Sequence, residues 1–271
     1  MINTILGSLY VDAQGEPDEP TVLLWPSLFT DHRMWRHQIA PLREAGWRTI
    51  VIDPPGQGQS YGPGRDFTMD ECAEVAVQVL DATGVRQPVV VIGDSWGGFV
   101  APRIAMRAPN RLSGMVLFNT SAERGTSFER IKAVLLTKLL AIKALDKVTV
   151  RLIVSGLLAP ETLSREPELG VDIAEHFIAW DRRQFIETVR SVLVDRDPVL
   201  DALPQLTVPA LIVSGKEDHT LPSFHSQRMA RKLSNARHIE VAGAAHLVPL
   251  EAPHEANSLI LDFLRDLPRA W

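Results

Sequence analysis

A serine within a glycine-rich turn is the first feature of this sequence that could do chemistry. The stretch from Val89 to Val100 reads V-V-V-I-G-D-S-W-G-G-F-V, with Ser95 at the centre of a G-x-S-x-G pattern. A serine hydroxyl is a poor nucleophile at neutral pH, so a base must take its proton as it attacks. The pattern therefore predicts nucleophilic catalysis if a histidine and an acid follow. The alternative is an ordinary strand-to-helix turn with an incidental serine.

Two later segments supply the base and the acid. Asp218 follows the apolar run P-A-L-I-V-S, and His246 follows the run R-H-I-E-V. Histidine suits a general base because its unperturbed pKa lies near neutral pH, and a buried carboxylate holds the imidazole tautomer. Asn119, at the end of an earlier run, cannot replace the acid because it is an amide. We therefore expect a triad of Ser95, Asp218 and His246.

A parallel sheet is needed to bring these residues together. Short apolar runs bounded by turn residues alternate with helical patterns, which is typical of an α/β fold with right-handed crossovers. In such sheets ligands bind outside the carboxyl ends of the strands. The expected strands are Thr21–Trp25, Arg48–Asp53, Val89–Ile92, Leu112–Asn119, Pro209–Ser214 and Arg237–Val241.

The alternation breaks between residues 121 and 203, where only helical patterns occur. We predict an α/β core of residues 1–120 and 204–271, interrupted by a helical lid (cap) of residues 121–203. Phe128, Trp180 and Phe185 in this lid are candidates for an apolar substrate wall, although packing within the lid explains them equally well. The predicted lid helices are Phe128–Leu145, Val148–Leu158, Val171–Ala179 and Asp181–Leu193.

The first lid helix is basic as well as amphipathic. It carries Lys132, Lys138, Lys143 and Lys147 among leucines and isoleucines. This pattern allows a helix that lies on a membrane surface. A lid helix with a solvated face is the reading that we favour from sequence.

The composition excludes several classes of function. The chain has 271 residues and a formal net charge of −5, so it offers no basic field for nucleic acid. Its one cysteine, Cys72, rules out an internal disulfide framework and a cysteine-rich metal site. No apolar run is long enough for a membrane span, and no secretory signal is visible, so we expect a cytoplasmic protein. No metal-ligand spacing appears, and the predicted chemistry needs no cofactor.

Two carboxylates outside the triad receive structural interpretations. Asp53 precedes the loop P-P-G-Q-G-Q-S, whose backbone donors it is expected to fix. Asp94 directly precedes Ser95, where a carboxylate would complement the N-terminus of the following helix.

Several motifs together resemble those of the α/β-hydrolase superfamily, and the resemblance covers essentially the whole chain. They are G-D-S-W-G, S-G-K-E-D, A-G-A-A-H and D-P-P-G-Q-G-Q-S, and the early loop S-L-F-T-D-H-R-M-W is similar to that of 3-oxoadipate enol-lactonase-like members. The resemblance implies a mostly parallel eight-stranded sheet flanked by helices, with a helical lid inserted after the sixth strand. It also implies that Ser95 is the nucleophile, His246 the base and Asp218 its orienting acid. The backbone N–H groups of Leu28 and Trp96 would form the oxyanion hole, with the Trp96 side chain as a pocket wall.

We therefore expect a serine hydrolase that cleaves a small, largely apolar carboxylic ester or lactone through an acyl-enzyme. The alternative is a carbon–carbon bond hydrolase of ring-fission dienones, for which Arg103, Arg182 and Arg183 are candidate carboxylate ligands. A cofactor-free perhydrolase and a non-catalytic small-ligand receptor are further alternatives. The expected partner is a small-molecule substrate, and the chain is expected to be a monomer or homodimer.

Overall fold

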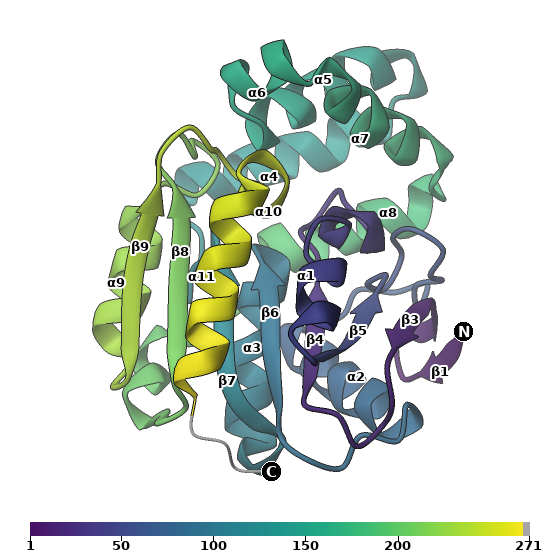
Figure 1. Ribbon diagram of the computed structural model, residues 1–271. Coiled ribbons are helices and arrows are strands. Elements are labelled where there is room, and N and C mark those ends of the chain that lie inside the picture. Colours follow the sequence, from purple (N-terminus) through teal and green to yellow (C-terminus); the bar gives the residue numbers. More distant parts are fainter. Residues whose placement is uncertain (268–271) are drawn as a thin grey trace.

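A seven-stranded sheet forms the centre of the molecule in the computed structural model, which describes residues 1–267 apart from the side chains of residues 176–179 (Figure 1). The strand order is β3-β5-β4-β6-β7-β8-β9, and every neighbouring pair is parallel except β3 with β5. The strands are β3 (Val11–Gln14), β4 (Thr21–Trp25), β5 (Arg48–Ile52), β6 (Val89–Asp94), β7 (Leu112–Phe118), β8 (Ala210–Gly215) and β9 (Ala236–Val241).

The central strands are apolar because helices cover both faces of the sheet. All residues of β4, β5, β6 and β8 are buried, as expected for parallel strands with no solvent-facing side. α1 (Ile39–Glu44) and α11 (Pro253–Asp266) lie on one face, whereas α2 (Met69–Ala82) and α3 (Trp96–Arg107) lie behind the sheet (Figure 1). A capping box between Thr68 and Glu71 defines the start of α2. The α/β fold predicted from the sequence is confirmed.

Within the part of the chain that the structure describes, the main sheet has seven strands rather than the eight that we expected. The N-terminal strands β1 (Ile2–Thr4) and β2 (Gly7–Leu9) pair only with each other, in a separate two-stranded sheet. The chain passes from one sheet to the other at Tyr10, whose N–H donates to the Ser60 hydroxyl while its carbonyl accepts from Asp53. The helical insert consequently follows the fifth strand of the main sheet, β7, instead of the sixth.

The insert lies over the carboxyl ends of the strands (Figure 1). Its first predicted helix is two elements, since α4 ends at Leu140 and a 3₁₀ turn follows at Lys143–Leu145. The segment between β4 and β5 also contains two elements, a 3₁₀ turn at His32–Trp35 and α1. The insert contains α4 (Ser127–Leu140), α5 (Asp146–Leu157), α6 (Pro160–Arg165), α7 (Pro167–Ala179), α8 (Arg182–Val189) and a π-helical turn at Arg190–Val194.

After the insert the sheet continues through β8, α9 (Phe224–Lys232) and β9. The short helix α10 (Val248–Glu251) then leads into α11. Within residues 1–267, no helix has the length and apolar character that crossing a membrane requires.

Candidate active site

Ser95 lies in a sharp turn between β6 and α3. Its backbone has φ 46° and ψ −96°, a left-handed conformation that a residue with a side chain rarely adopts. The turn is held because the Ser95 N–H donates to the Phe118 carbonyl at 2.9 Å and the Ser95 carbonyl accepts from Phe99 N–H at 3.0 Å. The surrounding structure maintains this strained backbone conformation, which presents the Ser95 side chain to a cavity at the end of the sheet.

Two glycines make this turn possible because the backbones approach closely. A Cβ atom on Gly93 would lie 2.5 Å from the carbonyl carbon of Gly97, and a Cβ atom on Gly97 would collide with the carbonyl oxygen of Trp25. The glycines of the G-x-S-x-G pattern therefore allow the backbones of β6, α3 and β4 to pack closely against one another.

His246 and Asp218 form a buried hydrogen-bonded pair. The Nδ1 atom of His246 lies 2.7 Å from Oδ2 of Asp218, and both side chains are almost fully buried. The other carboxylate oxygen of Asp218 accepts from the backbone N–H groups of Thr220 at 2.8 Å and Leu221 at 2.9 Å. These bonds orient the carboxylate, so that Nδ1–H donates to Asp218 and Nε2 is the ring nitrogen left to accept a proton.

Negative charge around His246 stabilises its protonated form. Burial by itself lowers the pKa of an imidazole, but the Asp218 carboxylate, with further contributions from Asp94 and Glu251, raises the pKa of His246 to about 9. A histidine with this environment is a strong base towards an alcohol.

Ser95 and His246 line the same cavity, which has a volume of about 310 Å³. Leu28 and Phe29 from the loop after β4 form one wall, and Phe99 of α3 contributes another apolar surface. A cavity of this size and character suits a small, largely apolar molecule. The insert contributes Gly125, Glu129, Lys132, Ala133, Leu136, Leu152, Ile153, Gly156, Leu157, Leu193 and Arg196 to the lining.

We expect the backbone N–H groups of Leu28 and Trp96 to form the oxyanion hole. Leu28 lines the cavity beside Ser95, and Trp96 is the first residue of α3, where backbone N–H groups have no partner within the helix. The loop that carries Leu28 is held by a 2.7 Å hydrogen bond from the Phe29 N–H to the Gln57 side-chain carbonyl.

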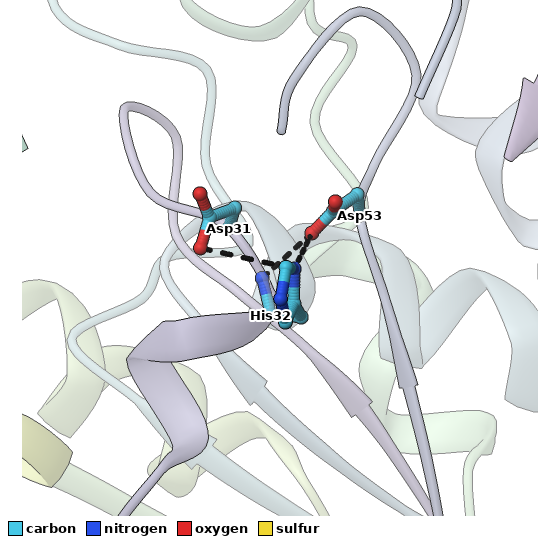
Figure 2. A group of neighbouring side chains, drawn as sticks. All are labelled: Asp31, His32 and Asp53. Atoms are coloured by element: carbon cyan, nitrogen blue, oxygen red, sulfur yellow. Dashed lines mark hydrogen bonds and ion pairs between the residues drawn. The ribbon is translucent and has the colours of Figure 1, made fainter. Parts of the chain in front are cut away.

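Asp31, His32 and Asp53 form a second polar cluster, which joins this loop to the loop after β5 (Figure 2). One Asp53 oxygen accepts from the His32 backbone N–H at 2.7 Å and from its Nδ1 at 2.8 Å, and the other accepts from Gln59 N–H at 2.8 Å. Asp31 caps the 3₁₀ turn and pairs with Arg33. Atoms of three side chains lie close enough to share a metal ion, but their engaged oxygens fit the loop-fixing role that we predicted for Asp53.

The aromatic residues predicted to form a substrate wall do not line the cavity. Phe128 points to solvent with 69% of its surface exposed. Trp180 packs on Phe185, and Phe185 packs edge-on against Phe29, so both lie behind the cavity wall. The Trp96 side chain is fully buried in the core, with its ring against those of Trp25 and Phe67. Helical periodicity shows which residues share a helix face. It does not show whether that face lies against the core, the cavity or solvent, so the sequence could not predict where these side chains point.

Arg196 is a cavity residue that sequence reasoning missed. Its guanidinium carbon lies 3.6 Å from the centre of the Phe99 ring, and its Nη2 donates to the Glu123 carbonyl at 3.0 Å. Burial lowers the pKa of Arg196 to about 9. Among the described residues, no carboxylate forms an ion pair with it.

The three arginines singled out from the sequence have other partners. Arg103 pairs with Asp70 at 3.2 Å, whereas Arg182 pairs with Asp146 at 2.6 Å and Arg183 with Glu187 at 3.3 Å. None of the three lines the cavity.

Glu251 was also missed, and it joins the histidine loop to the insert. One carboxylate oxygen accepts from the N–H groups of Ala245 at 2.9 Å and Leu247 at 3.1 Å, on either side of His246. The other accepts from Ala159 N–H at 2.7 Å and the Thr162 hydroxyl at 2.9 Å. A glutamate in a short apolar helix carries no sequence signal for these contacts.

Asp94, which we predicted to complement the N-terminus of α3, is buried at the end of β6. Its carboxyl group is fully buried, and neither oxygen has a hydrogen-bond partner of good geometry among the described residues. Burial raises the pKa of Asp94 well above its usual value.

Comparisons with known proteins identify the fold family. Residues 20–253 match the family model described as alpha/beta hydrolase fold. The chain is similar to a thermophilic esterase from Thermogutta terrifontis, with a TM-score of 0.86 and 24% identity over 95% of this chain and 93% of that one.

Two curated relatives are similar in sequence. The 3-oxoadipate enol-lactonase 2 of Acinetobacter baylyi is 23% identical over 91% of this chain and 89% of its own length. The polyketide synthase ThaQ of Burkholderia thailandensis is 26% identical over 93% of this chain, which spans only 12% of that much longer protein. With the family model matched over most of its length, the chain belongs to the α/β-hydrolase fold family.

Proposed function

We propose that this protein is a serine hydrolase that cleaves a small, largely apolar carboxylic ester or lactone through an acyl-enzyme. The observation that carries the proposal is the cavity of about 310 Å³ that Ser95 shares with His246, whose Nδ1 is hydrogen-bonded to Asp218. Similarity to an enol-lactonase and to an esterase supports the same class of reaction.

In the proposed first step, Nε2 of His246 takes the hydroxyl proton of Ser95 as Oγ forms a bond to the substrate carbonyl carbon. The carbonyl electron pair moves onto its oxygen, which the backbone N–H groups of Leu28 and Trp96 would stabilise. When the carbonyl re-forms, the bond to the leaving oxygen breaks and His246 gives that oxygen its proton. In a lactone the leaving oxygen stays attached to the acyl group.

Water completes the proposed cycle. His246 takes a proton from a water molecule as the water oxygen bonds to the acyl carbon. The bond from that carbon to Ser95 Oγ then breaks, and the serine recovers a proton from His246. The acid product leaves with the enzyme unchanged.

We further propose that residues 121–203 act as the lid over this reaction. Its helices supply about half of the residues that line the cavity, including Leu136 and Ile153. Substrate selection would then depend on the insert, while the core supplies the reacting groups.

The test is hydrolysis of p-nitrophenyl esters of increasing acyl length and of simple lactones by purified wild type and Ser95→Ala. We expect the variant to lose turnover to the uncatalysed rate, and a fluorophosphonate probe to label Ser95 in the wild type alone. Ser164→Ala, at an exposed serine on α6, is the matched control and should retain full activity. Wild-type rates in Ser95→Ala would refute the proposal.

A second candidate is carbon–carbon bond hydrolysis of ring-fission dienones. Arg196 favours this candidate, because its buried guanidinium group lies in the cavity wall, where a substrate carboxylate could bind. The decay of a coloured dienone, measured beside p-nitrophenyl ester hydrolysis, separates the two. A larger kcat/KM for the dienone would replace the first candidate with the second.

A further inference from the structure

Exposed apolar side chains are concentrated on one part of the insert. Of the thirteen large apolar residues that are exposed among the described side chains, seven lie on α4, on α5 or between them. Their exposed fractions range from 39% to 69%. Isolated exposed apolar residues are ordinary, whereas a cluster marks an interaction site. The seven are Phe128, Ile131, Val134, Leu135, Ile142, Val148 and Leu152.

The exposed apolar residues of α4 follow helical periodicity. Phe128, Ile131 and Leu135 have the spacing i, i+3 and i+7, which places them on one helix face. Ala133 and Leu136 of the same helix line the cavity instead. The helix is therefore apolar towards solvent as well as towards the protein.

Positive charge surrounds this apolar surface. The whole chain contains only six lysines, and four of them, Lys132, Lys138, Lys143 and Lys147, lie between residues 132 and 147. Among the ion pairs of the described residues, none involves these four. We call these four lysines and the seven apolar residues the apolar–basic face.

Few negative charges offset the lysines. Residues 127–157 hold six basic and two acidic residues, although the chain as a whole has a net charge of −5. Both acids are engaged elsewhere, since Glu129 lies 3.5 Å from His225 and Asp146 pairs with Arg182 at 2.6 Å. The segment therefore keeps an excess of positive charge that can meet an anionic partner.

The apolar–basic face is continuous with the wall of the candidate active site. Lys132 and Leu152 are exposed members of the face, and both also line the cavity that contains Ser95. Whatever binds the face consequently lies beside the substrate cavity.

We propose that the apolar–basic face docks this protein on the surface of an anionic phospholipid bilayer. The apolar side chains would enter the boundary between headgroups and acyl chains, while the lysine stems extend so that their ammonium groups reach lipid phosphates. Docking brings the cavity to the phase in which apolar esters accumulate. A second copy of the chain is a poorer occupant, because a symmetric contact would place four lysines of each copy against those of the other.

The experiment is vesicle co-sedimentation with the Ser95→Ala variant, which reports binding whether or not the proposed hydrolysis occurs. Vesicles of phosphatidylcholine alone are compared with vesicles containing about one third phosphatidylglycerol, at low and high salt. We expect binding to the anionic vesicles that weakens with salt. Absence of binding to the anionic vesicles would overturn the proposal.

Two sets of substitutions at exposed positions outside the cavity test the residues. Lys138→Gln/Lys143→Gln/Lys147→Gln should weaken partitioning at least about ten-fold, and Ile131→Ser/Leu135→Ser should do so by a similar factor, about ten-fold. Lys232→Gln on α9 and Met106→Ser on α3 are the matched controls and should bind as the parent protein does.

Solution measurements distinguish the other occupants. Unchanged hydrolysis of a water-soluble ester by the same substitutions in the Ser95-containing protein shows that they fold. Vesicle binding that both sets leave intact would overturn the assignment. A dimer in sedimentation equilibrium that Ile131→Ser/Leu135→Ser dissociates would show instead that the face binds a second copy of the chain.

Discussion

Oδ2 of Asp218 lies 2.7 Å from Nδ1 of His246, and the carboxylate raises the pKa of that imidazole to about 9 against the opposing effect of burial. Because neutral imidazole is the form that accepts a proton, kcat/KM for an ester should increase with pH up to about 9. A raised pKa also means that the pair's contribution to stability is complete below pH 6.5 and is lost as the pH rises through about 9. A pH–rate profile and urea unfolding at several pH values measure both effects.

Asp218→Asn tests the cause of this shift. Removing the charge should lower the pKa of His246 and reduce kcat by about 10⁴-fold, because the amide no longer holds the productive tautomer. Glu217→Gln, one residue earlier, is the control and should leave the profile unchanged. A rising limb of the pH–rate profile that stays at the same pH in Asp218→Asn would assign that limb to another group.

Asp94→Asn should stabilise the protein at neutral pH. Burial raises the pKa of the native carboxyl group well above its usual value, so ionisation in the unfolded chain favours unfolding as the pH increases above about 4. The advantage of the variant should grow by up to about 1.4 kcal/mol per pH unit until the native group itself ionises. Urea unfolding of both proteins at pH values from acidic to alkaline measures this advantage. A difference that does not depend on pH would contradict the raised pKa of Asp94.

Glu251→Gln should reduce both stability and activity. The carboxylate accepts four hydrogen bonds, including those from Ala245 N–H and the Thr162 hydroxyl. The NH₂ group of a glutamine donates hydrogen bonds, so it would face buried N–H and O–H groups that also donate. We expect the free energy of unfolding to fall by about 2–4 kcal/mol and kcat to fall with it, since the loop of His246 loses its attachment to the insert. Glu255→Gln, exposed at the start of α11, should have little effect on either.

Gly97→Ala should disrupt the turn that carries Ser95. The added methyl group would collide with the carbonyl oxygen of Trp25. Trp25 is the last residue of β4, so the collision could be relieved only if this strand moved. We expect a loss of about 3 kcal/mol or more of unfolding free energy, measured by chemical denaturation. At Gly125 the nearest atom to an added Cβ is 3.5 Å away, so Gly125→Ala should be nearly neutral and serves as the matched variant.

Asp53→Asn should release the loop that carries Leu28. Burial lowers the pKa of His32, but the hydrogen-bonded Asp53 carboxylate outweighs burial and raises the pKa of this imidazole above 6.5. The stabilisation from this pair is thus complete below pH 6.5 and disappears as the pH rises through the raised pKa of His32. NMR titration of His32 should show its pKa falling in the variant, with a lower kcat from a less ordered loop. An unchanged titration would mean that Asp53 does not set the charge of His32.

The sequence by itself determined the class of fold and the candidate nucleophile. Buried strands such as Val89–Ile92 are readable because parallel strands covered on both faces are continuous apolar runs. The elbow at Ser95 is readable because Gly93 and Gly97 are required by close backbone approach within a few residues. The order of Ser95, Asp218 and His246 at strand ends follows from the same local patterns.

Only the tertiary structure decided what surrounds those residues. Phe128 points to solvent, whereas Leu136 of the same helix lines the cavity. Helical periodicity groups residues on a face but does not predict whether that face contacts solvent or the cavity. The contact of Glu251 with Thr162 and the place of Arg196 on the Phe99 ring join segments far apart in the chain. Such contacts depend on how the insert packs over the sheet, and that packing is set by many weak interactions that no short stretch of sequence contains.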